Sequence, residues 1–256
     1  LLEVLRNFDN SGESVNEERN RIKRFKIEHN GKEKEINVKC FSRKNRITEF
    51  IYKYFKGSKG KRSYLYGRKL LQLGIKTPEP IAYFDDYYDE TAEEKRTFYI
   101  SENLEYQLTC REIFGNGNFT HEAEEIVKKD KEKLIKLFTE FTFSLHEKGV
   151  EFHDYSPGNV LIKKTNDDSY EFYLIDLNRM TFRKKLGFSR RMKNVSRMME
   201  ETQYIEKFSK YYSELYKKNY LRVFFRLYSF VKIHESNVAL KDNTRTFRYF
   251  FKRKKR

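Results

Sequence analysis

Two polar residues in one short segment are of the types that phosphoryl transfer uses. Asp154 and Asn159 stand in the run His153-Asp-Tyr-Ser-Pro-Gly-Asn159, where Pro157 and Gly158 favour an irregular loop. A carboxylate can orient or accept the proton of an attacking hydroxyl group, and a carboxamide oxygen can bind Mg²⁺. The pattern therefore predicts a loop that presents both groups to a phosphate.

A second carboxylate follows this loop after a predicted hairpin. Asp176 closes the apolar run Phe172-Tyr-Leu-Ile-Asp176, and a polar turn separates this run from a predicted strand over 160–163. The hairpin would bring Asp176 and the loop to one cleft, with Asp176 and Asn159 as magnesium ligands. An H-D-x-x-x-x-N string alone arises by chance in roughly a few per cent of such chains. The prediction rests on the joint pattern, and His153 is interpreted as packing the loop.

Three further positions are candidates for nucleotide binding. Lys39 lies on a strand predicted from alternation over 35–41, where its ammonium group would contact the α- and β-phosphates. Gly12 is the candidate for a tight turn over the phosphates, and a plain turn is the alternative. At the end of the sheet-like part, Glu102 and Leu104 are expected to offer backbone groups to adenine.

The elements that must position these residues indicate an α+β, bilobal, protein-kinase-like fold. A sheet-rich first lobe is predicted over 1–102 and a mainly helical second lobe over 103–256. The predicted strands of the first lobe cover 21–27, 35–41, 81–84 and 97–100, and a helix covers 63–73, with Gly74 ending it. In the second lobe, an amphipathic helix over 122–148 precedes the loop.

The charge of the chain indicates an anionic partner. Its 54 Lys and Arg residues exceed its 38 Asp and Glu residues, which gives a formal net charge of +16. Such a field attracts an acidic membrane or a phosphorylated glycolipid, although a Lys-rich solubilising surface gives the same balance. Nucleic acid is not expected as a partner, and no obligate protein partner is evident.

The remaining composition favours a cytoplasmic protein. Cys40 and Cys110 form no metal-binding spacing and no disulfide framework, so reduced thiols are expected. No apolar run approaches the length of a membrane span, and no signal peptide is expected. The C-terminal run 221–233 interleaves aromatic and basic residues. It is interpreted as a helix that packs its aromatic side chains into the second lobe, with contact to an anionic membrane as the alternative.

The motifs together resemble the lipopolysaccharide kinase (Kdo/WaaP) family, bacterial relatives of protein kinases. The resemblance implies a bilobal kinase-like fold and transfer of the ATP γ-phosphate, with Mg²⁺, to a sugar hydroxyl of a lipid A–Kdo or inner-core acceptor. It also implies functional positions at Lys39, Asp154, Asn159 and Asp176. The matching pieces are Phe8-Asp9 to Gly12, Arg19-Asn-Arg-Ile22, Val38-Lys39, Lys61-Arg-Ser-Tyr64, Leu73-Gly-Ile-Lys-Thr-Pro-Glu-Pro-Ile-Ala82, Ser101-Glu102, His153-Asp154 to Asn159, and Ile175-Asp-Leu-Asn-Arg179.

Two departures from kinase patterns qualify this resemblance. A Glu that holds Lys39 is expected on the helix after the Lys strand, but Leu65 stands at that position. Three alternatives remain open: Glu49, the acidic residue between Cys40 and Thr77, replaces it, a carboxylate from another part of the chain holds Lys39, or activity is reduced. In addition, Asp176 is followed by Leu177-Asn178 rather than Phe-Gly, and no Ala-Pro-Glu segment follows. The second departure argues against protein substrates.

Two alternatives remain open at this stage. The chain could be a kinase of another small polyol or an aminoglycoside, which would use the same residues. It could also be a non-catalytic pseudokinase or basic binding module, for which Leu65 is the supporting observation. The expected location is the cytoplasm, with peripheral attachment to the cytoplasmic face of the inner membrane as a hypothesis.

Overall fold

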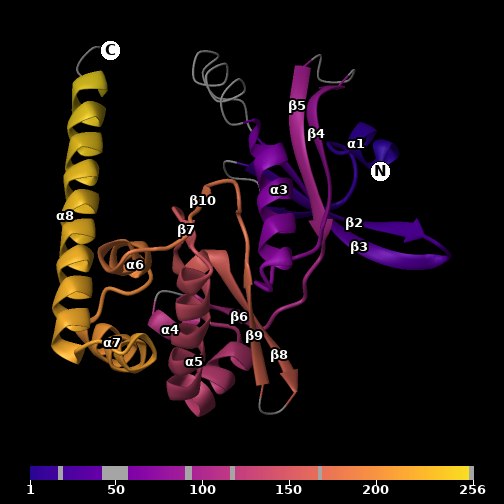
Figure 1. Ribbon diagram of the computed structural model, residues 1–256. Helices are drawn as coiled ribbons and strands as arrows, with labels where there is room; N and C mark the ends of the chain where they lie inside the picture. Colours follow the sequence, from indigo (N-terminus) through magenta and orange to yellow (C-terminus); the bar gives the residue numbers. More distant parts are fainter. Residues whose placement is uncertain (17–19, 42–56, 90–93, 116–118, 167–168, 254–256) are drawn as a thin grey trace. The chain divides into compact units, whose positions relative to one another are not determined.

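The computed structural model describes residues 1–16, 20–41, 57–89, 94–115, 119–166 and 169–253, apart from the side chains of residues 16, 89, 94 and 241–253. The chain forms two compact units (Figure 1). The first unit comprises Leu1–Tyr106 and Tyr173–Met180, and the second comprises Gln107–Phe172 and Thr181–Arg256. The first unit is rich in strands and the second is mainly helical, which confirms the predicted fold class.

The units differ from the predicted lobes in one respect that concerns the site. The division falls after Tyr106 rather than after residue 102, and the segment Tyr173–Met180 belongs to the first unit. Asp176 is therefore part of the same unit as Lys39, whereas Asp154 and Asn159 are part of the second. Sequence separation alone would have placed all three polar residues of the motif in one lobe.

The first unit is built on an antiparallel sheet with the strand order β1-β2-β3-β5-β4. A two-residue hairpin turn joins β2 and β3, and its residues Asn30 and Gly31 have the positive φ angles, 53° and 68°, that such a turn requires. The strands are β1 (Glu13–Asn16), β2 (Asn20–His29), β3 (Lys32–Phe41), β4 (Pro80–Asp89) and β5 (Glu94–Glu102).

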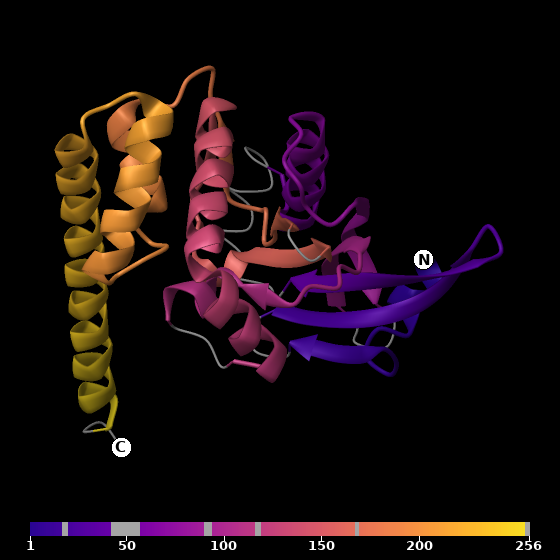
Figure 2. The ribbon, with the colours of Figure 1, turned by 90° about the horizontal axis from the view of Figure 1, so that it is seen from below.

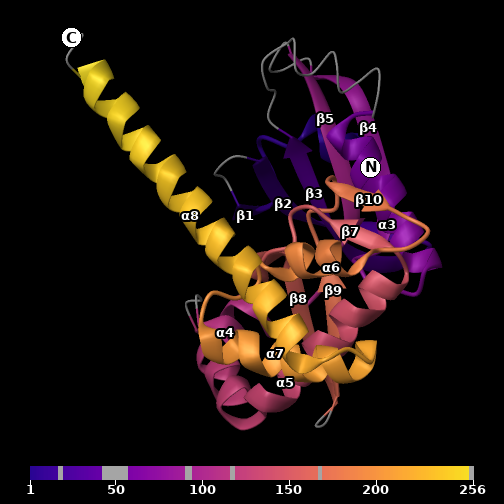
Figure 3. The same cartoon turned by 60° about the vertical axis from the view of Figure 1, so that its left-hand side comes forward.

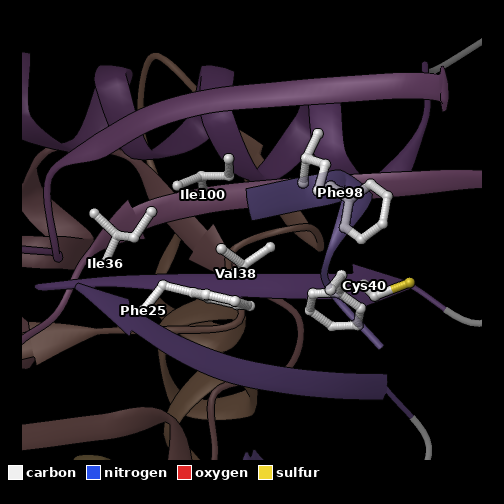
Figure 4. Close-up of a cluster of buried hydrophobic side chains, with 8 residues drawn as sticks. Phe25, Ile36, Val38, Cys40, Phe98 and Ile100 are labelled. Carbon is white, nitrogen blue, oxygen red and sulfur yellow. The ribbon is translucent and has the colours of Figure 1, made fainter. Parts of the chain in front are cut away.

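One face of this sheet carries the apolar core of the first unit. Side chains alternate along a strand, so Ile36, Val38 and Cys40 of β3 lie on the same face as Phe98 and Ile100 of β5 (Figure 4). The short helix α1 (Leu2–Arg6) covers this face, and the side chains of Leu5 and Phe8 are completely buried in the cluster. The sequence did not predict α1, because a five-residue helix has too few turns to show a helical period.

The opposite face of the sheet is covered by α3 (Lys59–Gln72). The helix predicted over 63–73 is confirmed, and it begins earlier because the Ser58 hydroxyl group caps it by accepting the Lys61 N–H. Gly60 lets the helix approach closely, since a Cβ there would lie 2.6 Å from the carbonyl oxygen of Phe98 and 2.9 Å from the Thr97 methyl group. Thr97 pairs with Phe41, which shares its strand face with Lys39.

The second unit packs helices around an aromatic core. Phe138 of α5 is completely buried and contacts the rings of Phe114, Tyr155 and Phe208. The helix predicted over 122–148 is confirmed as α5, which lies beside α7 (Figure 2). The elements are β6 (Leu108–Thr109), α4 (Cys110–Phe114), α5 (His121–Glu147), β7 (Val150–Phe152), the 3₁₀ turn η1 (Pro157–Asn159), β8 (Val160–Asn166), β9 (Ser169–Leu174), β10 (Met180–Phe182), α6 (Phe188–Val195), α7 (Thr202–Tyr216) and α8 (Tyr220–Arg253).

The long helix α8 packs on α6 and α7 and extends beyond both (Figure 3). Among the side chains of α8 up to Leu240, the buried ones are aliphatic, namely Val223, Leu227 and Val231, which are spaced by one helical turn. The expectation that this helix packs its aromatic residues into the unit is wrong for Phe225, whose side chain is 60% exposed. Among the described helices, none has the length and apolar character needed to cross a membrane.

Candidate functional site

The first group of candidate residues centres on an ion pair in the first unit. Lys39 lies on β3, on the face opposite Val38 and Cys40, and its ammonium nitrogen is 2.8 Å from Oδ1 of Asp176. The Lys39 side chain is 14% exposed and that of Asp176 is 32% exposed. Partial burial weakens the screening of this ion pair by water, so the attraction is stronger than for a pair on the open surface.

Asp176 is held in place by backbone and side-chain bonds on both sides of it. Upstream, the Thr77 hydroxyl group donates a hydrogen bond of 2.7 Å to the carbonyl oxygen of Leu174, and the Leu174 N–H donates to the carbonyl oxygen of Lys76 at 3.0 Å. Downstream, the amide of Asn178 donates to Oδ1 of Asp176 at 2.7 Å. The carboxylate oxygen thus receives two donors from within the first unit.

The backbone at Asp176 has an uncommon conformation. The predicted strand ends at Leu174 rather than at Asp176, and Asp176 adopts a φ angle of 56° in the left-handed region. A residue other than glycine in this region costs on the order of 1 kcal/mol, although Asp and Asn tolerate it better than most residues. Such conformations concentrate at functional sites, where the surrounding structure enforces them.

Helix α3 supports the segment that follows Asp176. A Cβ at Gly67 would lie 2.5 Å from Cγ of Pro80 and 3.1 Å from Cδ1 of Leu177. The Leu177 side chain is buried, with 2% of its surface exposed. The absence of a side chain at Gly67 therefore lets α3 and the residue next to Asp176 pack at close range.

The second group of candidate residues is the 153–159 loop in the second unit. The amide of Asn159 donates a hydrogen bond of 2.8 Å to the backbone carbonyl oxygen of Asp154, and the Asn159 N–H donates to the carbonyl oxygen of Ser156 at 2.9 Å. Pro157 begins the 3₁₀ turn η1, which ends at Asn159. The predicted loop is thus held by a hydrogen bond between Asn159 and Asp154, the two residues of the motif.

A buried polar network supports the start of this loop. The amide nitrogen of Asn194 donates to the carbonyl oxygen of Phe152 at 2.7 Å, so its amide oxygen faces Nε2 of His146 at 3.3 Å. Nδ1 of His146 lies 2.9 Å from the Tyr212 hydroxyl group and accepts a hydrogen bond from it. Burial, together with the positive charge of Arg191, lowers the pKa of His146 to about 3. His146 therefore bridges α5, α6 and α7 as a neutral ring.

The other predicted residues occupy defined places. Gly12 has a φ angle of 82° and lies between α1 and β1, against the ring of Phe25, rather than in the connection between β1 and β2. The Glu102 carboxylate accepts a hydrogen bond of 2.9 Å from Lys34, and Leu104 follows β5. The nucleotide-binding roles of Gly12, Glu102 and Leu104 stay predictions. So does the shared cleft for Asp176 and the 153–159 loop.

His153 contacts a neighbouring strand, and its role in packing the loop stays a prediction. Its Nε2 atom lies 2.8 Å from the hydroxyl oxygen of Thr181, and the side chain is exposed. This bond joins the loop to β10.

The expectation that position 65 is the place of the missing glutamate is wrong. Leu65 is 47% exposed, whereas the buried side of α3 consists of Gly60, Ser63, Gly67 and Leu70. A helix turns by 100° per residue, so position 65 faces away from the sheet that carries Lys39. Within the described residues the ion-pair partner of Lys39 is Asp176, and Glu49 lies outside those residues.

The donor set of these residues suits magnesium bound together with a nucleotide. Mg²⁺ is commonly held by one or two carboxylates plus substrate phosphates, and the side-chain oxygens of Asp176 and Asn159 are of the kind that it prefers. That these two residues, which belong to different units, share one ion stays a prediction. Among the described residues, no group of three or more His, Cys, Asp and Glu side chains could hold a metal ion on its own.

The structure adds supporting residues that the sequence analysis missed. Thr77 and Asn194 bind backbone carbonyl oxygens next to the candidate residues, and Arg197 contacts the 153–159 loop. Arg111 lies against Gly158, where a Cβ would come within 2.5 Å of a guanidinium nitrogen, so a larger residue there would displace the Arg111 side chain. No sequence pattern marks these residues, because each acts on a segment far from it in the chain.

Comparisons with known proteins agree with this architecture. A solved structure described as "WaaP in complex with acyl carrier protein" superposes with a TM-score of 0.56 over 89% of this chain and 87% of that chain, at 16% sequence identity. This likeness supports the fold alone. No curated protein matches the sequence. The model of the lipopolysaccharide kinase (Kdo/WaaP) family matches residues 12–224, and the chain belongs to this family.

Proposed function

We propose that this protein transfers the γ-phosphate of ATP to a sugar hydroxyl of a lipid A–Kdo or lipopolysaccharide inner-core acceptor. Family membership supports a phosphotransferase that acts in lipopolysaccharide synthesis. The observation that carries the proposal is the ion pair between Lys39 and Asp176. A kinase needs a cation that contacts the phosphates of the nucleotide and a carboxylate that binds the metal. The ion pair joins the two side chains of the first unit that we assign to these roles.

Each candidate residue has a proposed role in this reaction. Lys39 contacts the α- and β-phosphates, and Asp176 and Asn159 hold magnesium. When bound, Mg²⁺ would neutralise negative charge on the phosphate oxygens. Asp154 orients the acceptor hydroxyl group and takes its proton. Positioning and charge neutralisation carry most of the catalysis, since phosphoryl transfer needs little covalent chemistry from the protein.

A phosphate-transfer assay tests this proposal directly. Purified protein is incubated with radiolabelled ATP, with and without Mg²⁺, and with Kdo-containing lipid A, a heptose-containing core oligosaccharide, an aminoglycoside and a simple polyol in separate reactions. We expect label on a lipopolysaccharide precursor and none without the divalent ion. Label on the aminoglycoside or polyol alone would assign a different small-molecule kinase. No label on any acceptor, with no stabilisation by ATP and Mg²⁺, would indicate a non-catalytic member of the family.

We also propose that α8 meets the anionic inner-membrane surface while the enzyme acts on its glycolipid. The outward face of the helix exposes Leu221, Phe225 and Ile233, with 55%, 60% and 55% of their surfaces accessible. The same helix carries Arg222, which lies over the Phe188 ring of α6, and Arg226, which donates to the Ser189 hydroxyl group, and the chain carries a net charge of +16. Apolar side chains beside basic ones suit the interface of an acidic bilayer, where each basic residue adds about 1 kcal/mol.

Vesicle co-sedimentation tests the membrane proposal. The protein should sediment with vesicles that contain a fifth phosphatidylglycerol and remain in solution with neutral vesicles. Phe225→Ser should weaken the binding, and Glu206→Gln on α7 serves as a control substitution. The related WaaP structure contains acyl carrier protein, so a protein is the second candidate partner. Binding of acyl carrier protein that Phe225→Ser weakens, without any vesicle binding, would favour that partner.

A further inference from the structure

Arg197 contacts the backbone and the side chain at the start of the 153–159 loop. Its Nη1 atom donates a hydrogen bond of 2.9 Å to the carbonyl oxygen of His153 and lies 3.4 Å from Oδ1 of Asp154. The Arg197 side chain is 38% exposed and that of Asp154 is 21% exposed. One guanidinium group therefore reaches both the loop backbone and the carboxylate that we assign to the acceptor hydroxyl.

The position of Arg197 is fixed by buried neighbours. Val195 is completely buried, and Met198 is 1% exposed, so the segment that carries Arg197 is anchored on both sides. The Met198 N–H donates to the carbonyl oxygen of Val195 at 2.9 Å and closes a turn at this point. Asn194, just before this turn, binds the carbonyl oxygen of Phe152. The turn between α6 and α7 is thus attached to the loop through Asn194 and Arg197.

The loop itself supplies no permanent positive charge. Protein kinases carry an Arg directly before the catalytic Asp in the H-R-D motif, whereas His153 stands there in this chain. No Lys or Arg occurs from His153 to Asn159. Nε2 of His153 is engaged with Thr181. Arg197 brings to Asp154 a charge that stays in place at any working pH.

We propose that Arg197 is a positioning residue for phosphoryl transfer, which holds the carboxylate of Asp154 toward the acceptor hydroxyl group. The inference rests on the proposed function. In the reaction, the acceptor oxygen forms a bond to the γ-phosphorus and its proton passes to Asp154, while the bond from phosphorus to the β–γ bridging oxygen breaks and ADP leaves. A fixed cation beside Asp154 also offsets the repulsion between that carboxylate and the incoming phosphate.

Substitutions at Arg197 test this role. Arg197→Ala should lower kcat about 10- to 100-fold while the KM for ATP changes less than about threefold, because Arg197 is assigned to Asp154 and not to the nucleotide. Arg197→Lys should recover part of the loss, since it restores the charge without the planar guanidinium group. Arg190→Ala is the control, because Arg190 is exposed and lies 3.4 Å from Glu151 instead. It should keep the activity of the parent.

A double-mutant cycle separates this role from a general structural one. If Arg197 acts through Asp154, Arg197→Ala should change the residual rate of Asp154→Asn by less than about threefold. An Arg197→Ala effect of the same size in both backgrounds would overturn the inference, and so would an Arg197→Ala enzyme with the kcat of the parent. If the alanine variant does not fold, Arg197→Gln takes its place in the same cycle, because Gln can still bind the His153 carbonyl oxygen but carries no charge.

The outcome for Arg197 is distinguishable from the outcome for the proposed function. A parent enzyme that transfers phosphate, with silent Arg197 variants, would reject the positioning role and leave the kinase assignment intact. A parent enzyme that transfers phosphate to none of the acceptors would reject both.

Discussion

The ammonium nitrogen of Lys39 lies 2.8 Å from Oδ1 of Asp176, and the two residues are 137 positions apart in the chain. The contact joins the third strand of the sheet to the segment after β9, and both belong to the first unit. Asn178 donates to the same carboxylate oxygen at 2.7 Å. The anion beside Lys39 in this structure is thus the proposed metal ligand, a carboxylate from a distant part of the chain and not a glutamate of helix α3.

Replacing the carboxylate of Asp176 should abolish binding of the metal–nucleotide complex. Asp176→Asn keeps a side chain that tolerates the positive φ angle, so it removes the charge with little change to the backbone. We expect activity to fall at least ~100-fold, and magnesium-dependent stabilisation by ATP to disappear in a thermal shift assay. Asp86→Asn is a matched control, because Asp86 has a similar φ angle of 53° in the same unit. Full magnesium-dependent stabilisation in Asp176→Asn would show that the metal role is wrong.

Removing the carboxylate of Asp154 should slow the chemical step more than it weakens binding. Asp154→Asn should lower turnover by ~10²–10⁴, the usual contribution of a general base, and keep the affinity for ATP within a small factor. Steady-state kinetics and a separate nucleotide-binding titration give the two quantities. Asp130→Asn in α5 provides a control carboxylate of the second unit. A normal turnover of Asp154→Asn would contradict the proposed role.

Removing the ammonium group of Lys39 should mainly weaken the binding of ATP. Lys39→Met keeps the apolar stem and removes the ammonium group, so the KM for ATP should rise about tenfold or more as the phosphate contact is lost. Lys32→Met, at the exposed beginning of the same strand, should leave the KM unchanged. An unaltered KM in Lys39→Met would leave the Lys39–Asp176 ion pair as a structural contact only.

The buried ring of His146 should make stability depend on pH. Its pKa is about 3 in the folded protein, against an ordinary histidine value of 6.5, so between these values the unfolded chain binds a proton that the folded protein does not. Stability is therefore lost as the pH falls below about 6.5, by up to about 1.4 kcal/mol per pH unit from this residue. His146→Gln retains a donor and an acceptor and cannot titrate. Urea unfolding at pH 7 and pH 5 should show a smaller loss for His146→Gln than for the parent, and an equal loss would contradict the assignment.

A methyl group at Gly67 should disturb the support of Asp176. Gly67→Ala would normally favour a helix by up to about 1 kcal/mol, but the new Cβ would lie 2.5 Å from Pro80 and 3.1 Å from Leu177. Overpacking of this kind costs about 1–3 kcal/mol, so the net effect should be a loss of stability together with a higher KM for ATP. Chemical denaturation and kinetics provide the measurements. Leu65→Ala on the exposed side of α3 should be close to neutral, and a stabilised Gly67→Ala protein would show that the contact relaxes freely.

The sequence alone determined most of the elements around the candidate residues and indicated a phosphotransferase. Alternation of side chains predicted the strands around Ile27 and Lys39, and a helical period predicted α5, because both patterns record which face of an element is buried. The 153–159 loop was predictable because proline, glycine and the two polar residues lie within one short segment. The short helix α1 escaped prediction because five residues are too few to show a helical period, and its burial depends on a sheet formed later in the chain.

The tertiary structure decided how the candidate residues are supported. Sequence spacing placed Asp176 with the helical part, but Leu174 accepts a hydrogen bond from Thr77 and donates one to Lys76, so the segment Tyr173–Met180 belongs to the first unit. Position 65 proved to face outward, because the small residues of α3 form the side that approaches the sheet. The contact of Arg197 with the loop joins residues more than 40 positions apart. Local patterns record burial and turn chemistry along one segment, whereas such contacts exist only once distant segments have packed together.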